Sequence, residues 1–241
     1  MNTSHRTVGV LGGMGPDATV DFMSKVIAMT VAESDQDHIH MIVDHNPKVP
    51  NRQCAIRHDD PVVGRELAAM AVRLERAGAD FLVMVCNSAH AFLEPMRQAT
   101  AIPFISIIDV SIAEIAKVLP GARQVGVLAT DGLLETGIFQ HALAAAGYTP
   151  VLPANGDIRQ LMTSIQRIKA GDRSDEVRQS MAALARTLVT GGAEIVIAGC
   201  TEIPLVLGAD DLSVPLVAST DVLARRTVEL ATGSVSLPAA R

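Results

Sequence analysis

The stretch FLVMVCNSAH at residues 81–90 decides the fold. Its apolar run is too short for a core helix and has no alternation of polar and apolar residues. The run therefore predicts a strand that is buried on both faces of a parallel sheet covered by helices. The run ends at Cys86, and small polar residues follow it. In such sheets ligands bind just beyond the carboxyl ends of the strands, so Cys86 lies at a candidate site.

A second stretch repeats this pattern. Both apolar runs follow a Gly-Ala-acid tripeptide, and the second run, IVIAGC, ends at Cys200. Other matched positions are Val8 with Val125 and Pro103 with Pro215. The matched positions lie between 112 and 117 residues apart. Echoes at nearly one offset indicate an internal duplication.

The composition is that of a globular α/β protein. Of the 241 residues, 49% are hydrophobic and 19% are charged, which argues against disorder. Only 2% are aromatic and Trp is absent, so the core must consist of aliphatic residues and methionine, and stacking on nucleic-acid bases is disfavoured. The net charge of −6 gives no basic footprint for a phosphate backbone, so we expect no nucleic-acid partner.

Two further expectations come from apolar runs and cysteine usage. No apolar stretch has the length of a secretory signal or a membrane span, so we expect a cytoplasmic protein without membrane association. The three cysteines, Cys54, Cys86 and Cys200, are odd in number and are not spaced as zinc pairs. We expect free thiols and no metal site.

Strands and helices alternate in each half, which predicts two small parallel sheets. A polar connection with two prolines at residues 44–52 is expected to be a loop, and Asp109 is expected to cap a helix. The expected strands are residues 7–11, 39–43, 81–86, 102–107, 124–130, 149–152, 195–200 and 214–217, and the expected helices include 16–33, 61–77, 157–170 and 174–190.

The predicted fold class is α/β, with two pseudo-symmetric parallel α/β domains that arise from the duplication. The first domain is expected to contain residues 1–105 plus 215–241, because the last helix returns to it, and the second to contain residues 106–214. The active site is expected in the cleft between the two domains, where both strand ends would meet one ligand.

Matched cysteines fit two kinds of chemistry. A single thiolate can be a nucleophile in acyl transfer, which needs a base partner and only one cysteine. A pair can act as base and acid on opposite faces of one carbon and so invert a stereocentre. The symmetry favours the pair, Cys86 and Cys200, because a racemase converts mirror images. Since each cysteine lies where a strand hands over to a helix, we expect a thiol pKa below the usual value of about 8.5. Cys54 has no echo and is interpreted as a small buried hydrophobe.

Four motifs resemble those of the aspartate/glutamate racemase superfamily, and of its aspartate racemase branch most closely. They are GGMGP at residues 12–16, NP through PNR at 46–52, CNSAH at 86–90 and GCTEIP at 199–204. The resemblance implies an enzyme that needs neither pyridoxal phosphate nor a metal, that uses Cys86 and Cys200 as two bases, and that forms a homodimer.

Departures from the glutamate racemases support the aspartate branch. Those enzymes carry an Asp-Ser-Gly loop after the first strand and Gly-Cys-Thr-His at the second cysteine, whereas here the loop is GGMG and Glu202 replaces the histidine. Ser88 stands where threonine is more usual and keeps the hydroxyl. The function that follows is interconversion of L- and D-aspartate, with glutamate as a further substrate.

A dicarboxylic amino acid needs cations or N–H donors at both ends. Arg52 is the first candidate for the side-chain carboxylate, through bidentate hydrogen bonds. By resemblance, Lys169 is the second, although a surface charge is the alternative. The backbone N–H groups of the 12–15 turn favour anions, and Met14 is expected to line the pocket or fill the core. Asp44 and Glu202 are weaker candidates, either as ammonium partners or as groups that support the residues contacting the substrate. His90 is expected to orient a neighbouring residue or to cap a helix and is left out of catalysis. The predicted substrate-binding set is Met14, Arg52, Asn87, Ser88, Lys169 and Thr201.

Other functions fit parts of the pattern. Gly13-x-Gly15-x-x-Ala18 is similar to a dinucleotide fingerprint, with Asp44 as ribose partner, but the spacing to Asp44 is too long and the cysteines stay unexplained. Superfamily members that act on hydantoins or maleate also keep paired cysteines. A non-enzymatic two-domain amino-acid-binding protein would need the cleft but no reactive thiols.

Overall fold

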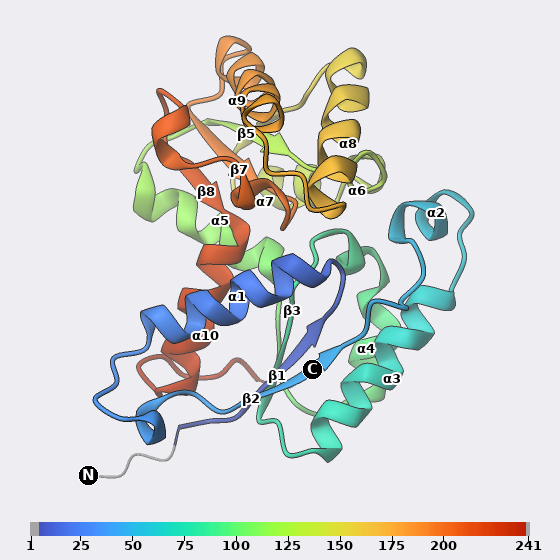
Figure 1. The fold of residues 1–241 in the computed structure, drawn as a ribbon, viewed down its shortest axis with the longest axis vertical. Coiled ribbons are helices and arrows are strands. Elements are labelled where there is room, and N and C mark those ends of the chain that lie inside the picture. Colours follow the sequence, from blue (N-terminus) through green and yellow to red (C-terminus); the bar gives the residue numbers. More distant parts are fainter. Residues whose placement is uncertain (1–4, 240–241) are drawn as a thin grey trace. The chain divides into compact units, whose positions relative to one another are not determined.

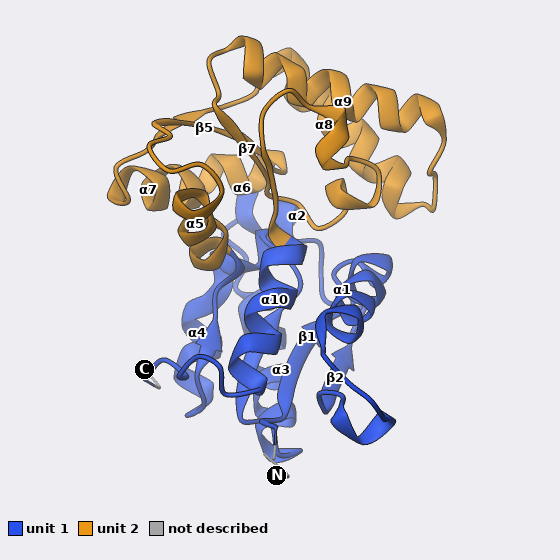
Figure 2. Cartoon of the chain, turned by 90° about the vertical axis from the view of Figure 1, so that its left-hand side faces the viewer, with its two compact units in different colours: residues 1–107, 220–241 blue, residues 108–219 orange. Residues whose placement is uncertain are grey.

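The computed structural model describes residues 5–239 and divides the chain into two compact units (Figure 2). Unit 1 comprises Met1–Ile107 with Thr220–Arg241, and unit 2 comprises Ile108–Ser219. The chain therefore passes between the units twice, immediately after Ile107 and immediately after Ser219. Sequence reasoning put these divisions at 105/106 and 214/215.

Unit 1 is built on a parallel sheet with strand order β2-β1-β3-β4. Figure 1 labels the first three of these strands. Its strands are β1 (Val8–Gly12), β2 (Met41–His45), β3 (Phe81–Met84) and β4 (Phe104–Ile105). Its helices are α1 (Pro16–Met29), α2 (Arg52–Arg57), α3 (Val62–Arg76), α4 (Leu93–Ala99) and all but the first residue of α10 (Ser219–Ala231), with 3-10 helices η1 (Asp35–Asp37) and η2 (Ser88–Phe92).

Unit 2 repeats this plan with strand order β6-β5-β7-β8, also parallel. Its strands are β5 (Gln124–Leu128), β6 (Thr149–Val151), β7 (Ile195–Ala198) and β8 (Leu216–Ala218). Its helices are all but the first residue of α5 (Ile107–Val118), together with α6 (Asp131–Thr136), α7 (Ile138–Ala145), α8 (Asn155–Lys169) and α9 (Asp175–Thr190), with 3-10 helices η3 (Ile203–Leu205) and η4 (Ala209–Asp211). The predicted class of two parallel α/β domains is confirmed.

The duplication extends to individual hydrogen bonds. Val85 N–H donates to Leu11 O at 3.0 Å, and Gly199 N–H donates to Leu128 O at 2.7 Å. At the start of the same strands, the Asp80 N–H donates to Thr7 O at 2.8 Å. The Glu194 N–H donates to Gln124 O at 2.9 Å in the same way. The two halves therefore hold the strand that leads to each cysteine in the same register.

Equivalent glycines sit where the first strand of each sheet meets its helix. A Cβ added at Gly9 would lie 2.9 Å from Ala79 Cβ, and one added at Gly126 would lie 3.1 Å from the equivalent Ala193 Cβ. Helix α3 approaches Gly9 through Leu74, and α9 approaches Gly126 through Leu188, whose Cβ atoms would each lie 3.2 Å from the added Cβ, so both helices pack closely on the first strand of their sheet.

Each unit has its own aliphatic core. Helix α3 buries one stripe of side chains with helical spacing, including Leu67, Met70 and Leu74, and the core of unit 1 includes Cys86. The core of unit 2 includes Cys200 in the same way. Apolar burial is the main stabilising contribution in each unit, at roughly 25 cal/mol per Å² of apolar surface removed from water.

Several predicted elements were wrong in extent. The helix predicted over 16–33 ends at Met29, because Thr30 adopts an extended backbone while its hydroxyl donates to Val26 O at 2.7 Å. The strand predicted over 102–107 keeps two residues, since α5 already begins at Ile107. Asp109 therefore lies inside the first turn of α5 and does not cap it. Helices α2 and α4 are short and were not predicted.

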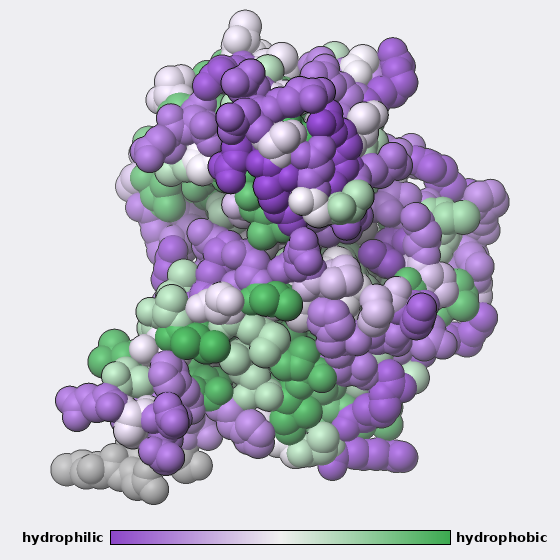
Figure 3. All heavy atoms as spheres, viewed as in Figure 1, coloured by the Kyte–Doolittle hydropathy of each residue, from purple (hydrophilic) through white to green (hydrophobic). Residues whose placement is uncertain are grey.

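Apolar side chains also gather on part of the surface of unit 1. Figure 3 shows them over the region that contains α1. Val20 and Ile27 on this helix are 58% and 49% exposed, and Val31, two residues after it, is 95% exposed. No helix within residues 5–239 has the length and apolarity to cross a membrane.

Candidate active site

The two matched cysteines occupy equivalent places in the two units. Strand β3 ends two residues before Cys86, and β7 ends two residues before Cys200. Both are free thiols in buried side chains, each 6% exposed. Each cysteine thus lies just beyond the carboxyl edge of its own sheet, where the sequence predicted it, and a short 3-10 helix follows instead of an α-helix.

The turn that carries Cys86 is fixed by His90. The Ile107 N–H donates to His90 Nε2 at 3.2 Å, so Nε2 carries the lone pair and Nδ1 carries the proton. The Nδ1–H donates to the Cys86 carbonyl at 2.9 Å. Burial lowers the pKa of His90 from about 6.5 to about 4, which its hydrogen bond to Cys86 opposes and the charge of Arg97 reinforces. Neutral His90 therefore links the Cys86 turn to the start of α5 through two hydrogen bonds.

Helix α2 brings polar groups to the same turn. Gln53 Nε2 donates to Ser88 Oγ at 3.3 Å. Arg52, which was predicted in a loop, is the first residue of α2, because Asn51 caps this helix by accepting from the Cys54 N–H at 3.0 Å. Its Nη1 donates to the carbonyls of Val49 and Pro50 at 3.0 and 2.9 Å. One arm of the guanidinium therefore stabilises its own loop, and binding of a carboxylate by Arg52 stays a prediction.

The glycine turn after β1 makes more contacts within the fold than expected. The Gly13 N–H, expected to be open to a ligand, donates to Thr19 Oγ1 at 2.8 Å. Gly13 has φ of +87°, and a Cβ there would lie 2.5 Å from the backbone of Asn46, so the position requires glycine. The Met14 side chain is 1% exposed and packs in the core of unit 1. The structure gives Met14 a packing role, and its contact with a substrate stays a prediction.

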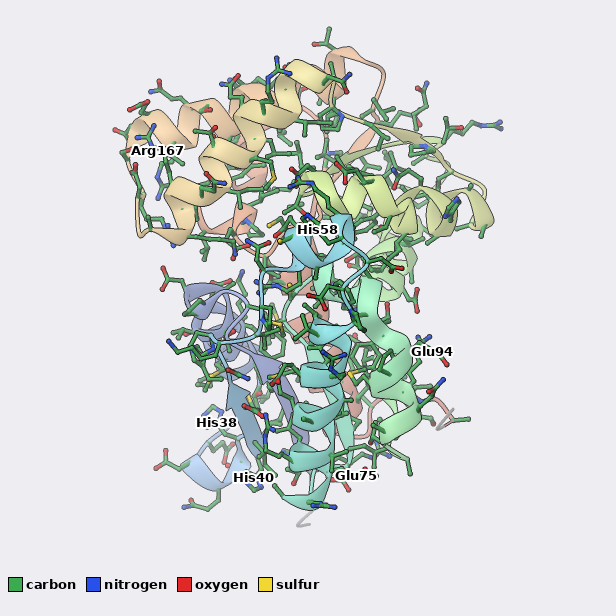
Figure 4. All side chains as sticks on the ribbon, turned by 90° about the vertical axis from the view of Figure 1, so that its right-hand side faces the viewer. His38, His40, His58, Glu75, Glu94 and Arg167 are labelled. Carbon is green, nitrogen blue, oxygen red and sulfur yellow. The ribbon has the colours of Figure 1, made fainter. Side chains whose placement is uncertain are left out.

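Two other side chains differ from expectation. Asp44 pairs with Arg73 at 2.7 Å and is thereby occupied, whereas it was a candidate partner for an ammonium group. Cys54 was predicted to be buried, but it is exposed on α2 because it faces away from the core that its neighbour Ala55 enters. Its Sγ lies 3.6 Å from His58 Nδ1, on the helix that bears the His58 label in Figure 4.

The turn that carries Cys200 holds charged groups. Cys200 Sγ donates to Glu202 Oε2 at 3.0 Å, and Thr201 Oγ1 donates to the same oxygen at 3.4 Å. The other oxygen, Oε1, forms an ion pair with Lys169 Nζ at the end of α8. The Glu202 side chain is 4% exposed and the Lys169 side chain 36%.

These contacts reverse one prediction. Burial raises the pKa of the Cys200 thiol well above its ordinary value, the negative charge of Glu202 raises it further, and Lys169 lowers it in part. The lowered pKa expected from a helix N-terminus was therefore wrong for Cys200, because η3 has only three residues and a carboxylate faces the thiol.

Comparison with known proteins agrees with this architecture. The Asp/Glu/Hydantoin racemase family matches residues 11–227. The chain belongs to this family. It is 30% identical over 228 residues to the broad specificity amino-acid racemase RacX of Bacillus subtilis. The aligned region covers 92% of this chain and 96% of RacX.

Solved structures of racemases share the fold of this one. The Picrophilus torridus aspartate racemase superposes with a TM-score of 0.84 at 27% identity and covers 95% of this chain and 94% of its own. The glutamate racemase isoform RacE1 of Bacillus anthracis has a TM-score of 0.67 at 23% identity, covering 92% of this chain and 80% of its own. The protein is therefore a racemase, an isomerase by reaction class.

The structure gathers the predicted site residues of this racemase into two groups. Cys86, Asn87 and Ser88 are consecutive in unit 1, while Cys200 and Thr201 in unit 2 share a turn with Glu202, the partner of Lys169. Within residues 5–239 no group of three metal-binding side chains is present.

Sequence reasoning missed two contacts in these groups. Gln53 stands next to the candidate Arg52 and is the side chain that reaches the Cys86 turn. Glu202 was a weaker candidate, as an ammonium partner or as a group that supports the site residues, and its direct contact with the Cys200 thiol was not predicted. Its position two residues after the cysteine was the available signal.

Proposed function

We propose that the protein is a cofactor-independent racemase that interconverts L- and D-aspartate by proton transfer at Cα. One observation carries this proposal: two buried free thiols stand at equivalent strand ends of two duplicated units. In this proposal one of the two thiols removes the proton from one face of Cα, and the other supplies a proton to the opposite face. Racemisation needs one base and one acid at such opposed positions.

The reaction balances with the two thiols alone. A thiolate at one cysteine takes the proton from Cα, and the resulting carbanion takes a proton from the thiol of the other cysteine. The first sulfur is then a thiol and the second a thiolate, and the product is the mirror image of the substrate. No bond to sulfur other than S–H forms, so neither cysteine is a nucleophile toward carbon.

The substrate class follows from the cations and hydroxyls at the two turns. Arg52 and Lys169 bind carboxylates, and Asn87, Ser88 and Thr201 bind the α-carboxylate and the amino group. The similarity to an aspartate racemase at 27% identity over nearly the whole chain supports aspartate. The 30% identity to a broad specificity amino-acid racemase favours a second candidate, a racemase that accepts several amino acids including glutamate.

Solvent exchange tests the proposal. Single enantiomers of aspartate and glutamate are incubated with the enzyme in D₂O, without pyridoxal phosphate and with a chelator, and followed by proton NMR and polarimetry. We expect loss of the α-proton signal together with loss of optical rotation, fastest for aspartate. Retention of the α-proton in both amino acids would reject the racemase proposal, and equal rates across a wider panel would favour the broad-specificity candidate.

The partner proposed for this racemase is a second copy of the chain. The exposed apolar side chains of α1, Val20 at 58% and Ile27 at 49%, are ones that a homodimer would cover.

A further inference from the structure

A continuous chain of polar contacts runs from Cys200 through Glu202 to Lys169. The thiol donates to one carboxylate oxygen at 3.0 Å, and the other oxygen is paired with the ammonium group. The Glu202 side chain is 4% exposed, whereas the Lys169 side chain is 36% exposed. This series of contacts therefore begins at a buried thiol and ends at a cation that is accessible to solvent.

A substrate carboxylate that arrives from solvent competes with Glu202 for Lys169. The lysine ammonium has three rotatable donors on a flexible stem, so it can turn from one carboxylate to another. A buried carboxylate that loses its cation is destabilised in its charged form, and its affinity for a proton rises. The nearest donor to Glu202 is the Cys200 thiol, which already points its proton at Oε2.

We propose that Lys169 and Glu202 form a substrate-operated switch that converts Cys200 from a thiol into a base. The inference rests on the proposed racemase function and assigns Glu202 as a positioning residue that acts through Cys200. When a substrate carboxylate takes Lys169, the thiol proton passes to Glu202, and the thiolate then removes the α-proton.

Protons balance through this cycle. Before binding, Cys86 and Cys200 are thiols and Glu202 is a carboxylate. After transfer, Glu202 is a carboxylic acid and Cys200 a thiolate. Once Cys200 has taken the α-proton and Cys86 has given its own to the opposite face, product release returns Lys169 to Glu202. Glu202 then releases its proton to water and Cys86 takes one from water.

The equivalent turn in unit 1 has a different residue at the switch position. Ser88 lies two residues after Cys86, as Glu202 lies two residues after Cys200, and it accepts a hydrogen bond from the neutral side chain of Gln53. A serine hydroxyl cannot store a proton near neutral pH. The switch should therefore affect proton abstraction by Cys200 and not by Cys86.

Isotope effects on Glu202→Gln test this one-sided action. Because the two enantiomers are equally stable, any variant must change kcat/KM by the same factor in both directions. Deuterium at Cα, however, slows only the abstraction step from the labelled enantiomer. We expect kcat/KM to fall about 100-fold, with the primary isotope effect rising for the enantiomer that Cys200 deprotonates and falling toward unity for its mirror image.

Two matched variants separate this effect from general damage. Lys117→Met removes another Lys–Glu pair in unit 2, whose atoms lie 3.2 Å apart, and Glu176→Gln removes the exposed carboxylate beside Arg167, which Figure 4 labels. Both should keep wild-type kinetics. Lys169→Met removes the cation that keeps Glu202 charged, so it should shift the two isotope effects in the sense opposite to Glu202→Gln, and it serves as the test should Glu202→Gln fail to fold.

A substrate-free measurement distinguishes the two proposals. Thiolate absorbance, titrated against pH and referenced to Cys200→Ser, should show Cys200 ionising at lower pH in Glu202→Gln than in wild type. Unchanged titration together with equal isotope effects for both enantiomers would overturn the switch and leave the racemase intact. Absence of α-proton exchange in the wild-type enzyme would instead reject the proposed function.

Discussion

The Cys86 turn and the Cys200 turn share a backbone and differ in chemistry. Both follow four-residue buried strands that pair in equivalent register with the first strand of their sheet, as Val83 does with Val10 and Ile197 with Val127. Around Cys86 the partner is a neutral histidine that binds the carbonyl, whereas around Cys200 it is a carboxylate that binds the thiol. Duplication has kept the positions of the sulfur atoms and let their surroundings diverge.

This divergence places the two turns under different physical constraints. His90 is buried and neutral, and both of its ring nitrogens are hydrogen-bonded, so it holds the turn without leaving a buried polar group unpaired. Glu202 is buried and paired with Lys169, whose side chain is 36% exposed, so removal of the lysine would leave a buried carboxylate without its cation. The reaction proposed for the two thiols is symmetric, whereas their environments differ.

Removal of each sulfur tests whether the two turns are equally necessary, and has the largest expected effect. Cys86→Ala and Cys200→Ala should each lower kcat for racemisation by about 10³-fold or more, which corresponds to about 4 kcal/mol, since each removes an acid or a base. Polarimetry from either enantiomer measures this.

The matched control is Cys54→Ala, which removes an exposed thiol of unit 1 and should retain wild-type activity. Full activity in either of the other two variants would disprove the two-base assignment, even if racemisation itself were real.

The shared part of the two turns was predictable from the sequence. The Gly-Ala-acid tripeptides, the apolar runs and the Val-Pro and Ile-Pro echoes reflect backbone packing, and packing leaves a periodic signature in the chain. The alternation of strands and helices along the chain and the strand ends near Cys86 and Cys200 followed from that signature, whereas the order of the strands within each sheet was not predicted. The glycine at position 13 was also recognisable as a turn residue.

The differing part was not predictable, because it depends on contacts between segments far apart in the chain. Lys169 meets Glu202 across 33 residues and Gln53 meets Ser88 across 35, and neither spacing leaves a pattern. The pKa of Cys200 was expected to fall from local helix geometry, but burial and one carboxylate decide it. Short elements such as α2 failed for another reason, since six residues hold too few apolar positions to show a period.

Acid titration sharpens the contrast at His90. Its pKa in the folded protein is about 4, below the ordinary value of 6.5, so the unfolded chain binds the proton more tightly. The stabilisation is complete above about pH 6.5 and is lost as pH falls toward 4, by about 3 kcal/mol in all, since each pKa step corresponds to about 1.4 kcal/mol.

The measurement is the free energy of unfolding in urea at several pH values between these limits, for wild type and His90→Asn. The variant should be less stable near neutral pH, and the difference from wild type should shrink by about 3 kcal/mol at the acid end. A control, His58→Asn, changes an exposed histidine and separates the loss of a buried ring from the loss of any histidine. A constant difference between wild type and His90→Asn at all pH values would contradict a buried neutral histidine.

The equivalent glycines test whether the halves are also matched in packing, and here the smallest effects are expected. At Gly9 a new methyl group would lie 2.7 Å from Leu82 Cδ2 and 2.9 Å from Ala79 Cβ, and at Gly126 it would lie 3.1 Å from Ala193 Cβ. A leucine tip can turn aside, but an alanine Cβ moves only with its backbone. Gly9→Ala should therefore destabilise the protein by about 2 kcal/mol and Gly126→Ala by about 1 kcal/mol, measured by thermal unfolding. Gly156→Ala on α8, where a Cβ meets open space, should be neutral or slightly stabilising. An equal or larger loss for Gly126→Ala would show that unit 2 is the more tightly packed half, because the order of the two clashes would then be reversed.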